Sequence, residues 1–153
     1  MNANHGHVVS IHISPTHGDE PTLVDRVRAV PGKGLEGDRH FDPDGHNPAG
    51  EARDITLIEV EQLGHYKNTH NVEMTPAQSR RNIATSGVRL NDLVDKTFHV
   101  GPVQVRGVEL CEPCGHLSRL THPTAVEGLL HRAGLRARIV TEGHIRVGDP
   151  VIT

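Results

Sequence analysis

A chain of 153 residues has the length of one domain and buries enough surface to form its own core. Its net charge of -3, sixteen scattered Lys and Arg residues and three aromatic residues argue against nucleic acid as the main partner. The absence of a signal peptide pattern, and of about eighteen consecutive apolar residues, predicts a cytoplasmic protein with reduced thiols and no membrane partner.

The first part of the chain predicts short strands and one helix. Alternating apolar and polar residues at 8–13 indicate a strand, and β-branched residues ended by a Pro-Gly pair indicate another at 24–30. A short apolar strand is expected at 54–58. It is expected to continue into a helix at 59–65.

The middle of the chain predicts a capped helix followed by strands. The sequence TPAQ at 75–78 forms a capping box that starts a short helix, and a strand is expected at 81–85. Further strands are expected at 97–100 and 103–110. In the last of these the apolar alternation slips by one residue across Gly107, and such a slip requires a bulge. We therefore predict a β-bulge at Gly107.

The only two cysteines follow this last strand, in the sequence CEPC. If the chain stays extended, Cys114 has the parity of Val108 and Leu110, and Cys111 points to the opposite side. Pro113 supports an extended chain because it restricts the residue before it. The two cysteines are therefore expected on opposite faces.

The last part of the chain predicts one clear helix and two closing strands. Pro123 opens the helix and Gly134 ends it. This helix is expected to cover one opening of the fold with an apolar stripe formed by Val126, Leu129, Leu130 and Ala133. Strands are expected at 135–140 and 144–152. Many short strands and few helices predict one mainly β domain over residues 1–153, a barrel with helices at its ends.

A glycine-rich segment, GKGLEG at 32–37, has the spacing of a dinucleotide fingerprint. That fingerprint needs a helix directly after it, and the following DPDG sequence indicates a turn instead. The glycines are therefore expected to shape a tight loop that can bind an anion. Three polar side chains stand at the exit of this loop: Asp38, Arg39 and His40.

An arginine pair joins the capped helix to the next strand, in the sequence SRRN at 79–82. Exposed arginines are common on solvated surfaces, which is one interpretation of this pair. The other is a clamp for phosphate or a pterin, because guanidinium groups bind phosphate through paired hydrogen bonds and Asn both donates and accepts. The side chains concerned are Arg80, Arg81 and Asn82.

The cysteine pair admits several interpretations from its residues alone. A closed zinc site needs four ligands, and Cys111, Cys114 and His116 supply only one half of such a set. The spacings of the thirteen histidines complete no closed zinc set. A thioredoxin-like pair suits the local order of strand, cysteines and short helix, but no βαβ units surround it. Two buried cysteines acting as small apolar residues are a further interpretation.

Several stretches of the sequence resemble the MOSC domain family. They are GKGLEGDRHF, RRNIATSGVRLNDLVDKTFHVGPVQVRGVELCEPC, HRAGLRARIV and IRVGDPV, in the family's order. This family comprises the C-terminal domain of molybdenum-cofactor sulfurases and stand-alone bacterial proteins, and the stand-alone type is the closer likeness. The resemblance covers about 24–151. It implies a closed β-barrel and a site for the pterin-based molybdenum cofactor, or for sulfur bound for it.

The resemblance also implies roles for individual residues. It places the family's essential cysteine at Cys114, the second cysteine of CEPC. This thiolate ligates molybdenum in members that resemble the amidoxime-reducing enzymes and is thought to carry sulfur in the sulfurase-linked members. Arg81 and Asn82 match an Arg and an Asn before a strand, which makes them candidates for gripping the pterin phosphate. The resemblance assigns no role to Asp38, Arg39 and His40, which are candidates for cofactor binding from their place at the exit of the glycine-rich loop. The remaining candidates for cofactor binding are Arg80, from the arginine pair, and Arg136.

Two classes of function follow from this resemblance. The first is an oxidoreductase that reduces small N-hydroxylated or N-oxide compounds, with Cys114 as molybdenum ligand and an electron-donor protein as partner. The second is a non-catalytic module that delivers sulfur or cofactor, with a persulfide on Cys114; a CxxC thiol-redox protein is a third interpretation. Thiolate suits the first two roles because it is a soft metal ligand and a nucleophile. The chain is expected to be a monomer or homodimer, with a cofactor that purification can remove.

Overall fold

Seven strands close into a barrel in the computed structural model, which describes residues 5–16, 20–45 and 54–153. The order around the barrel is β11 (Pro150–Ile152), β7 (Thr97–Val100), β8 (Val103–Leu110), β9 (Leu135–Ile139), β5 (Ile55–Glu59), β6 (Ile83–Ser86) and β1 (His5–Ile13). Pairing of β11 with β1 closes the ring. Neighbouring strands are antiparallel except β5 and β6, which are parallel. The predicted mainly β barrel is confirmed.

A smaller sheet lies beside the barrel. It contains β10 (Gly143–Arg146), β3 (Arg26–Val30) and β4 (Gly34–Leu35), while β2 (Thr22–Val24) extends the barrel sheet by pairing with β1. The predictions of single strands at 24–30 and 144–152 are therefore wrong, because each segment divides between two sheets. The two breaks lie together, since the N–H of Val147 donates to the carbonyl of Asp25 at 3.0 Å.

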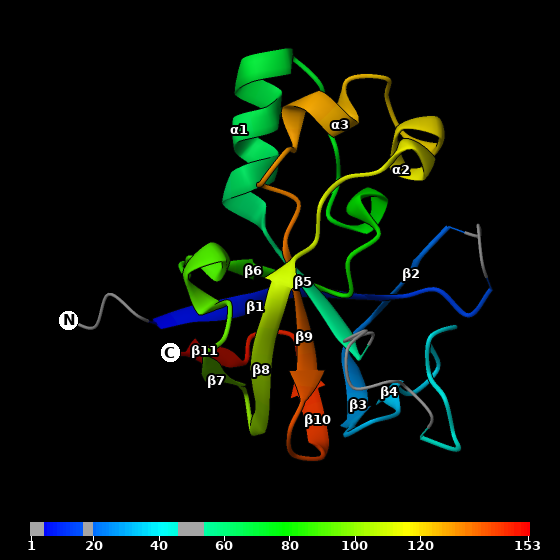
Figure 1. Cartoon of the computed structure of the whole chain (residues 1–153), viewed down its shortest axis with the longest axis vertical. Helices are drawn as coiled ribbons and strands as arrows, with labels where there is room; N and C mark the ends of the chain where they lie inside the picture. Colours follow the sequence, from blue (N-terminus) through cyan, green and yellow to red (C-terminus); the bar gives the residue numbers. More distant parts are fainter. Residues whose placement is uncertain (1–4, 17–19, 46–53) are drawn as a thin grey trace.

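The three α-helices of the described chain gather at one end of the barrel, at the top of Figure 1. They are α1 (Val60–His70), α2 (Gly115–Leu120) and α3 (Ala125–Gly128). The helix predicted after β5 is confirmed and continues to His70. The capping box is also confirmed, because Thr75 and Gln78 exchange side chain-to-backbone hydrogen bonds of 2.9 and 3.2 Å. It starts a 3-10 helix (Ala77–Ser79), and a second 3-10 helix spans Leu90–Leu93.

The helix predicted from Pro123 to Gly134 is wrong in its length. It shortens to the single turn of α3, where a Cβ on Gly128 would lie 2.3 Å from the ring of Tyr66. Leu129, directly after α3, is fully buried as predicted. Val126 and Leu130 are 38% and 50% exposed, so the expected apolar stripe is not buried as a unit.

Two apolar cores support this arrangement. The first fills the barrel and reaches the small sheet, with Phe98, Leu35 and Ile145 among its largest side chains. The second lies between the barrel and the helices and includes Tyr66 and Leu117. The helical end is thus packed onto the barrel through its own core.

The predicted bulge in β8 is confirmed. The register between β8 and β9 shifts between Gly107 and Glu109. Glycine is required there for a second reason, because a Cβ on Gly107 would lie 2.0 Å from the carbonyl oxygen of Leu93. Beyond the bulge, β8 ends at Leu110, and the cysteine segment, residues 111–114, follows it at the helical end of the barrel.

Candidate functional site

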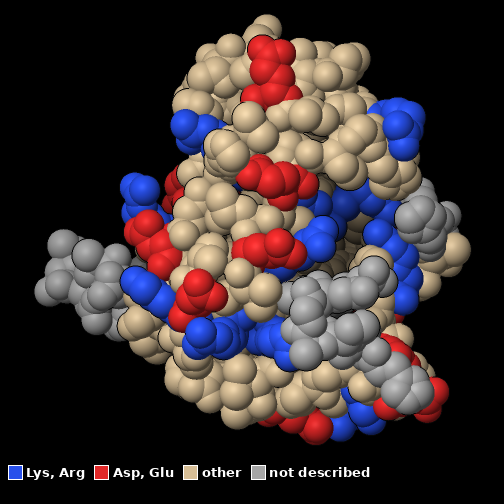
Figure 2. Space-filling model, in the orientation of Figure 1, with Lys and Arg blue, Asp and Glu red and all other residues tan. Residues whose placement is uncertain are grey.

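A cavity of about 390 Å³ opens where the barrel meets the helical end. Figure 2 shows a hollow on one face of the molecule with Lys and Arg side chains around it. All eight site residues predicted from the sequence line this cavity: Asp38, Arg39, His40, Arg80, Arg81, Asn82, Cys114 and Arg136. The fold therefore brings together residues from the glycine-rich loop, the arginine pair, the cysteine segment and β9.

The cavity carries an excess of positive charge. Four arginines line it, against Asp38 as the single carboxylate among the described lining residues. The Asp38 carboxylate accepts backbone hydrogen bonds from Ser14 at 2.8 Å and His40 at 3.3 Å, so it fixes the loop. Arg39 Nε is buried and has no hydrogen-bond partner in the described chain. Unpaired guanidinium donors of this kind favour an anionic ligand.

Arg80 enters the cavity from a strained backbone position. It caps the 3-10 helix at Ala77–Ser79 with a φ of 62°, the left-handed region that residues other than glycine rarely adopt. Such strain persists where the surrounding structure imposes it, and it concentrates at binding sites. Arg80 is thus placed by the turn that precedes β6.

Asn82 uses its side chain within the fold. Its Oδ1 accepts hydrogen bonds from the N–H and the hydroxyl of Thr56 at 3.1 and 3.0 Å, and its Nδ2 donates to the carbonyl of His12 at 3.2 Å. Asn82 therefore ties the start of β6 to β5 and β1. The geometry gives it a role in shaping the cavity wall, whereas the sequence predicted contact with a ligand.

His12 is a lining residue that the sequence analysis did not single out. Its side chain is 2% exposed, its Nδ1–H donates to the carbonyl of Arg81 at 2.9 Å, and its Nε2 accepts from the Ser10 hydroxyl at 2.8 Å. Burial lowers the pKa of His12 below its ordinary 6.5, and the hydrogen bond to Arg81 opposes this effect. A neutral imidazole therefore supports the backbone of Arg81.

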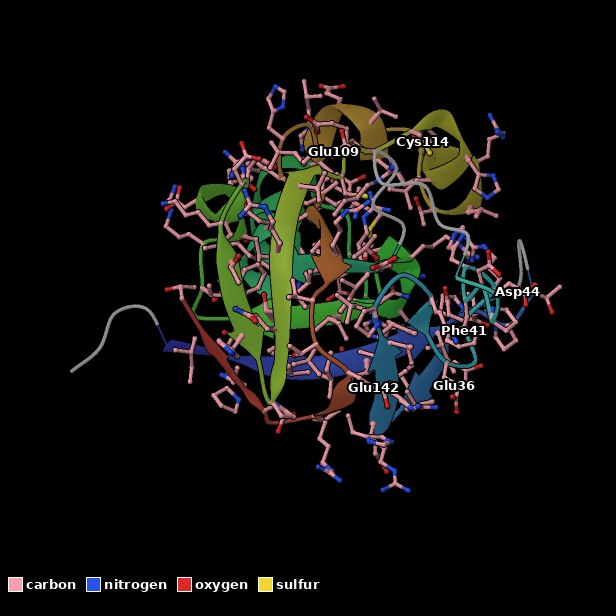
Figure 3. The ribbon with its side chains drawn as sticks, turned by 60° about the horizontal axis from the view of Figure 1, so that its bottom comes forward. Glu36, Phe41, Asp44, Glu109, Cys114 and Glu142 are labelled. Atoms are coloured by element: carbon pink, nitrogen blue, oxygen red, sulfur yellow. The ribbon has the colours of Figure 1, made fainter. Side chains whose placement is uncertain are left out.

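The two cysteines both line the cavity, so the prediction that they point to opposite faces is wrong. The parity argument fails because β8 ends at Leu110 and residues 111–114 form no strand. Cys111 is buried and Cys114 is exposed, and neither is in a disulfide. Figure 3 shows Cys114 beside the start of α2.

Arg136 places a guanidinium group close to both sulfur atoms. A side-chain hydrogen bond with Cys111 raises the pKa of Arg136, burial opposes this, and the charges of Cys111, Glu109 and Cys114 raise it further. The Glu109 carboxylate lies 3.9 Å from Arg136 Nη1 at the surface. Arg136 therefore places its positive charge beside Cys111.

Five further lining residues were outside the predicted set: Ser14, Pro21, Thr56, His116 and Leu117. His116 was considered only as a zinc ligand, and the others carried no motif that marks a site. In residues 5–16, 20–45 and 54–153, no three His, Cys, Asp or Glu side chains cluster as a metal site would require. No described helix is both long enough and apolar enough to cross a membrane.

Comparisons with known proteins identify the family to which this fold belongs. No curated protein matches the chain. The YuaD protein from Bacillus subtilis is similar in structure, with a TM-score of 0.82 at 18% identity over 96% of this chain and 94% of that one. YiiM from Geobacillus stearothermophilus gives 0.73 at 17% over 96% and 74%, and YiiM from Escherichia coli gives 0.67 at 15% over 95% and 68%. At identities this low, the structural similarity shows a shared fold. The model of the MOSC domain matches residues 36–152, most of the chain, and the chain therefore belongs to the MOSC domain family.

Proposed function

We propose that this chain binds the molybdenum cofactor in its arginine-lined cavity and reduces N-hydroxylated or N-oxide compounds there. One observation carries the proposal: an exposed thiol, Cys114, and four arginines meet in one cavity of about 390 Å³. A pterin cofactor offers a phosphate for guanidinium groups and a thiophilic metal for a thiolate. The buried Arg39 Nε without a partner is the kind of donor that an anionic group would satisfy.

The residues divide the proposed work between them. Arg39 and Arg80 would bind the phosphate, and the Cys114 thiolate would hold the metal. Bound there, the cofactor supplies two-electron redox chemistry. Reduction of a hydroxylamine takes up two electrons and two protons, breaks the N–O bond and releases water, so the electrons must come from a donor protein. Arg136 lines the same cavity as Cys114 and hydrogen-bonds to Cys111.

A second candidate function is favoured by the exposure of Cys114. A thiol at the surface end of a cavity can pass a sulfur atom to another protein, which suits a non-catalytic delivery module with a persulfide on Cys114. The two functions differ in what the purified chain retains. A reductase keeps molybdenum in about one equivalent per chain, whereas a carrier keeps sulfane sulfur.

The test compares the two cysteines as a matched pair. The wild type, Cys114→Ser and Cys111→Ser are produced in a host that makes the cofactor, and molybdenum, pterin phosphate and reductase activity with an artificial electron donor are measured. Cys114→Ser should lose molybdenum and activity, because a hydroxyl stays protonated and is a poor ligand for a soft metal. Cys111→Ser should keep most of both.

Other outcomes have distinct meanings. Wild-type protein that carries sulfane sulfur on Cys114 but no molybdenum supports the delivery module. Equal loss of activity in both variants, together with an internal disulfide in the wild type during turnover, would refute Cys114 as the sole working thiolate and support a dithiol mechanism.

A further inference from the structure

The guanidinium of Arg81 is committed to backbone carbonyls around the cysteines. Its Nε donates to the carbonyl of Ala133 at 2.8 Å, and its Nη2 donates to the carbonyls of Cys111 at 3.2 Å and Glu112 at 3.5 Å. One side chain from the start of the barrel strand β6 thus joins two segments that are distant in sequence. The planar guanidinium of arginine spreads five N–H donors over a fixed fork that reaches separated acceptors, whereas the three donors of a lysine ammonium all leave one nitrogen.

The cysteine segment, residues 111–114, rests on the turn at 131–134. The N–H of Cys111 donates to the carbonyl of Gly134 at 2.8 Å, and the Glu112 carboxylate accepts from the N–H of His131 at 2.7 Å. These contacts join the two segments to each other. Arg81 contacts both segments at once from its place before β6, whereas Arg136 reaches only Cys111 and Asn91 only His131 among the described contacts.

The backbone of Arg81 is itself fixed by neighbouring side chains. The imidazole of buried His12, on β1, donates to its carbonyl at 2.9 Å, and its N–H approaches the Ser79 hydroxyl at 3.4 Å. A guanidinium held in this way has little freedom to move toward a ligand. Hydrogen bonds from a charged donor are stronger than neutral ones, so removing the guanidinium from these part-buried carbonyls costs more than removing a neutral donor would.

We propose that Arg81 is a positioning residue that holds the cysteine segment against the barrel, and that the phosphate contacts fall mainly to other arginines of the cavity. The proposal rests on the proposed function in one respect only, which is that the positioning serves to present Cys114. The mechanical role of Arg81 belongs to the chain alone. This role can therefore be tested on protein that has never bound the cofactor.

The test uses full-length protein from a host that lacks cofactor synthesis. Arg81→Met keeps an unbranched apolar stem but removes the donors, Arg81→Lys keeps the charge but not the fork, and Arg132→Ala is the control. Arg132 lies in the same turn, but its Nη1 donates to Gln62 on α1 at 2.8 Å. Two rates are measured: amide hydrogen exchange over residues 108–117, and maleimide labelling of buried Cys111 in a Cys114→Ser background.

Loss of the fork should free the cysteine segment locally. Arg81→Met should raise both rates at least about tenfold, and Arg81→Lys at least about threefold, because a single ammonium replaces only part of the fork. Arg132→Ala should change both rates by less than about twofold. Circular dichroism checks that Arg132→Ala lowers the melting temperature about as much as the Arg81 variants do. If Arg81→Met does not fold, the Arg81→Lys rates decide the question.

A residue that merely grips an anion would behave differently. Both Arg81 variants would then exchange and label like the wild type, while cofactor content in a cofactor-making host would fall for Arg81→Met and stay for Arg81→Lys. That outcome overturns the positioning role. Absence of molybdenum from every variant and from the wild type would instead count against the proposed function, and the exchange and labelling rates would still decide the role of Arg81.

Discussion

Leu129 and Leu130 are neighbours with opposite environments, which makes them a sharp test of the core beneath the helices. Leu129 is fully buried in the second apolar core, with Tyr66 and Leu117, whereas Leu130 is 50% exposed. Leu129→Ala removes buried atoms and leaves a cavity, and should lower the free energy of unfolding by about 2 to 5 kcal/mol. Leu130→Ala should change it by less than about 0.5 kcal/mol.

Urea unfolding at neutral pH measures this difference directly. The midpoint should fall for Leu129→Ala with an unchanged slope, because the same surface is exposed on unfolding. In a chain of this length each kcal/mol shifts the melting temperature by about 2 to 4 °C, so a loss of about 4 to 20 °C is expected. Equal effects of the two substitutions, or a loss below about 0.5 kcal/mol for Leu129→Ala, would refute the assigned core.

Three further predictions concern two glycines and a histidine. Gly107→Ala forces a Cβ to within 2.0 Å of the Leu93 carbonyl oxygen and should cost at least about 3 kcal/mol in urea unfolding. Gly64→Ala in helix α1, where a Cβ meets nothing within 4 Å, should stabilise by up to about 1 kcal/mol, and a loss there would contradict the helix geometry. The lowered pKa of His12 means that unfolded protein binds more protons below the ordinary 6.5, so stability should fall as pH drops through that range. His12→Gln should flatten this dependence relative to the wild type, and identical pH profiles would show that His12 does not contribute.

Local features of the fold were predictable where one residue type has one structural solution. The slip of the apolar alternation across Gly107 required a bulge, and the register shift occurs at that residue. The capping box at Thr75 and Gln78 is a reciprocal hydrogen-bond pattern that needs only four residues. Both signals are short in range, so the rest of the chain did not need to be known.

Tertiary contacts decided the features that the sequence could not give. The predicted helix after Pro123 has the right apolar spacing, yet only the single turn of α3 forms. At the end of this turn Gly128 lies so close to Tyr66 that a Cβ would be 2.3 Å from its ring. The turn that follows brings Gly134 to the cysteine segment, where its carbonyl binds the N–H of Cys111. Spacing within one element carries no information about such partners.

The candidate site shows the same division between residue type and residue role. The arginine pair was predicted from chemistry and resemblance, and both side chains do line the cavity. What chemistry could not assign is which arginine spends its donors on the chain, because Arg81 serves three carbonyls while Arg39 Nε has no partner in the described residues. Which of these donors have a partner depends on contacts between segments that are distant in the sequence.

The charge balance of the cavity limits what can occupy it. Four guanidinium groups face one carboxylate, and Asp38 already accepts two backbone hydrogen bonds. Part of this charge is absorbed internally, by the carbonyls that Arg81 serves and by the contacts of Arg136 with Cys111 and Glu109. At the Arg39 end of the cavity, by contrast, the buried Nε has no hydrogen-bond partner among the described residues. Because partly buried cations are stabilised by an opposite charge, a ligand with an anionic group at that end and a thiophilic centre near Cys114 suits the cavity better than a neutral one.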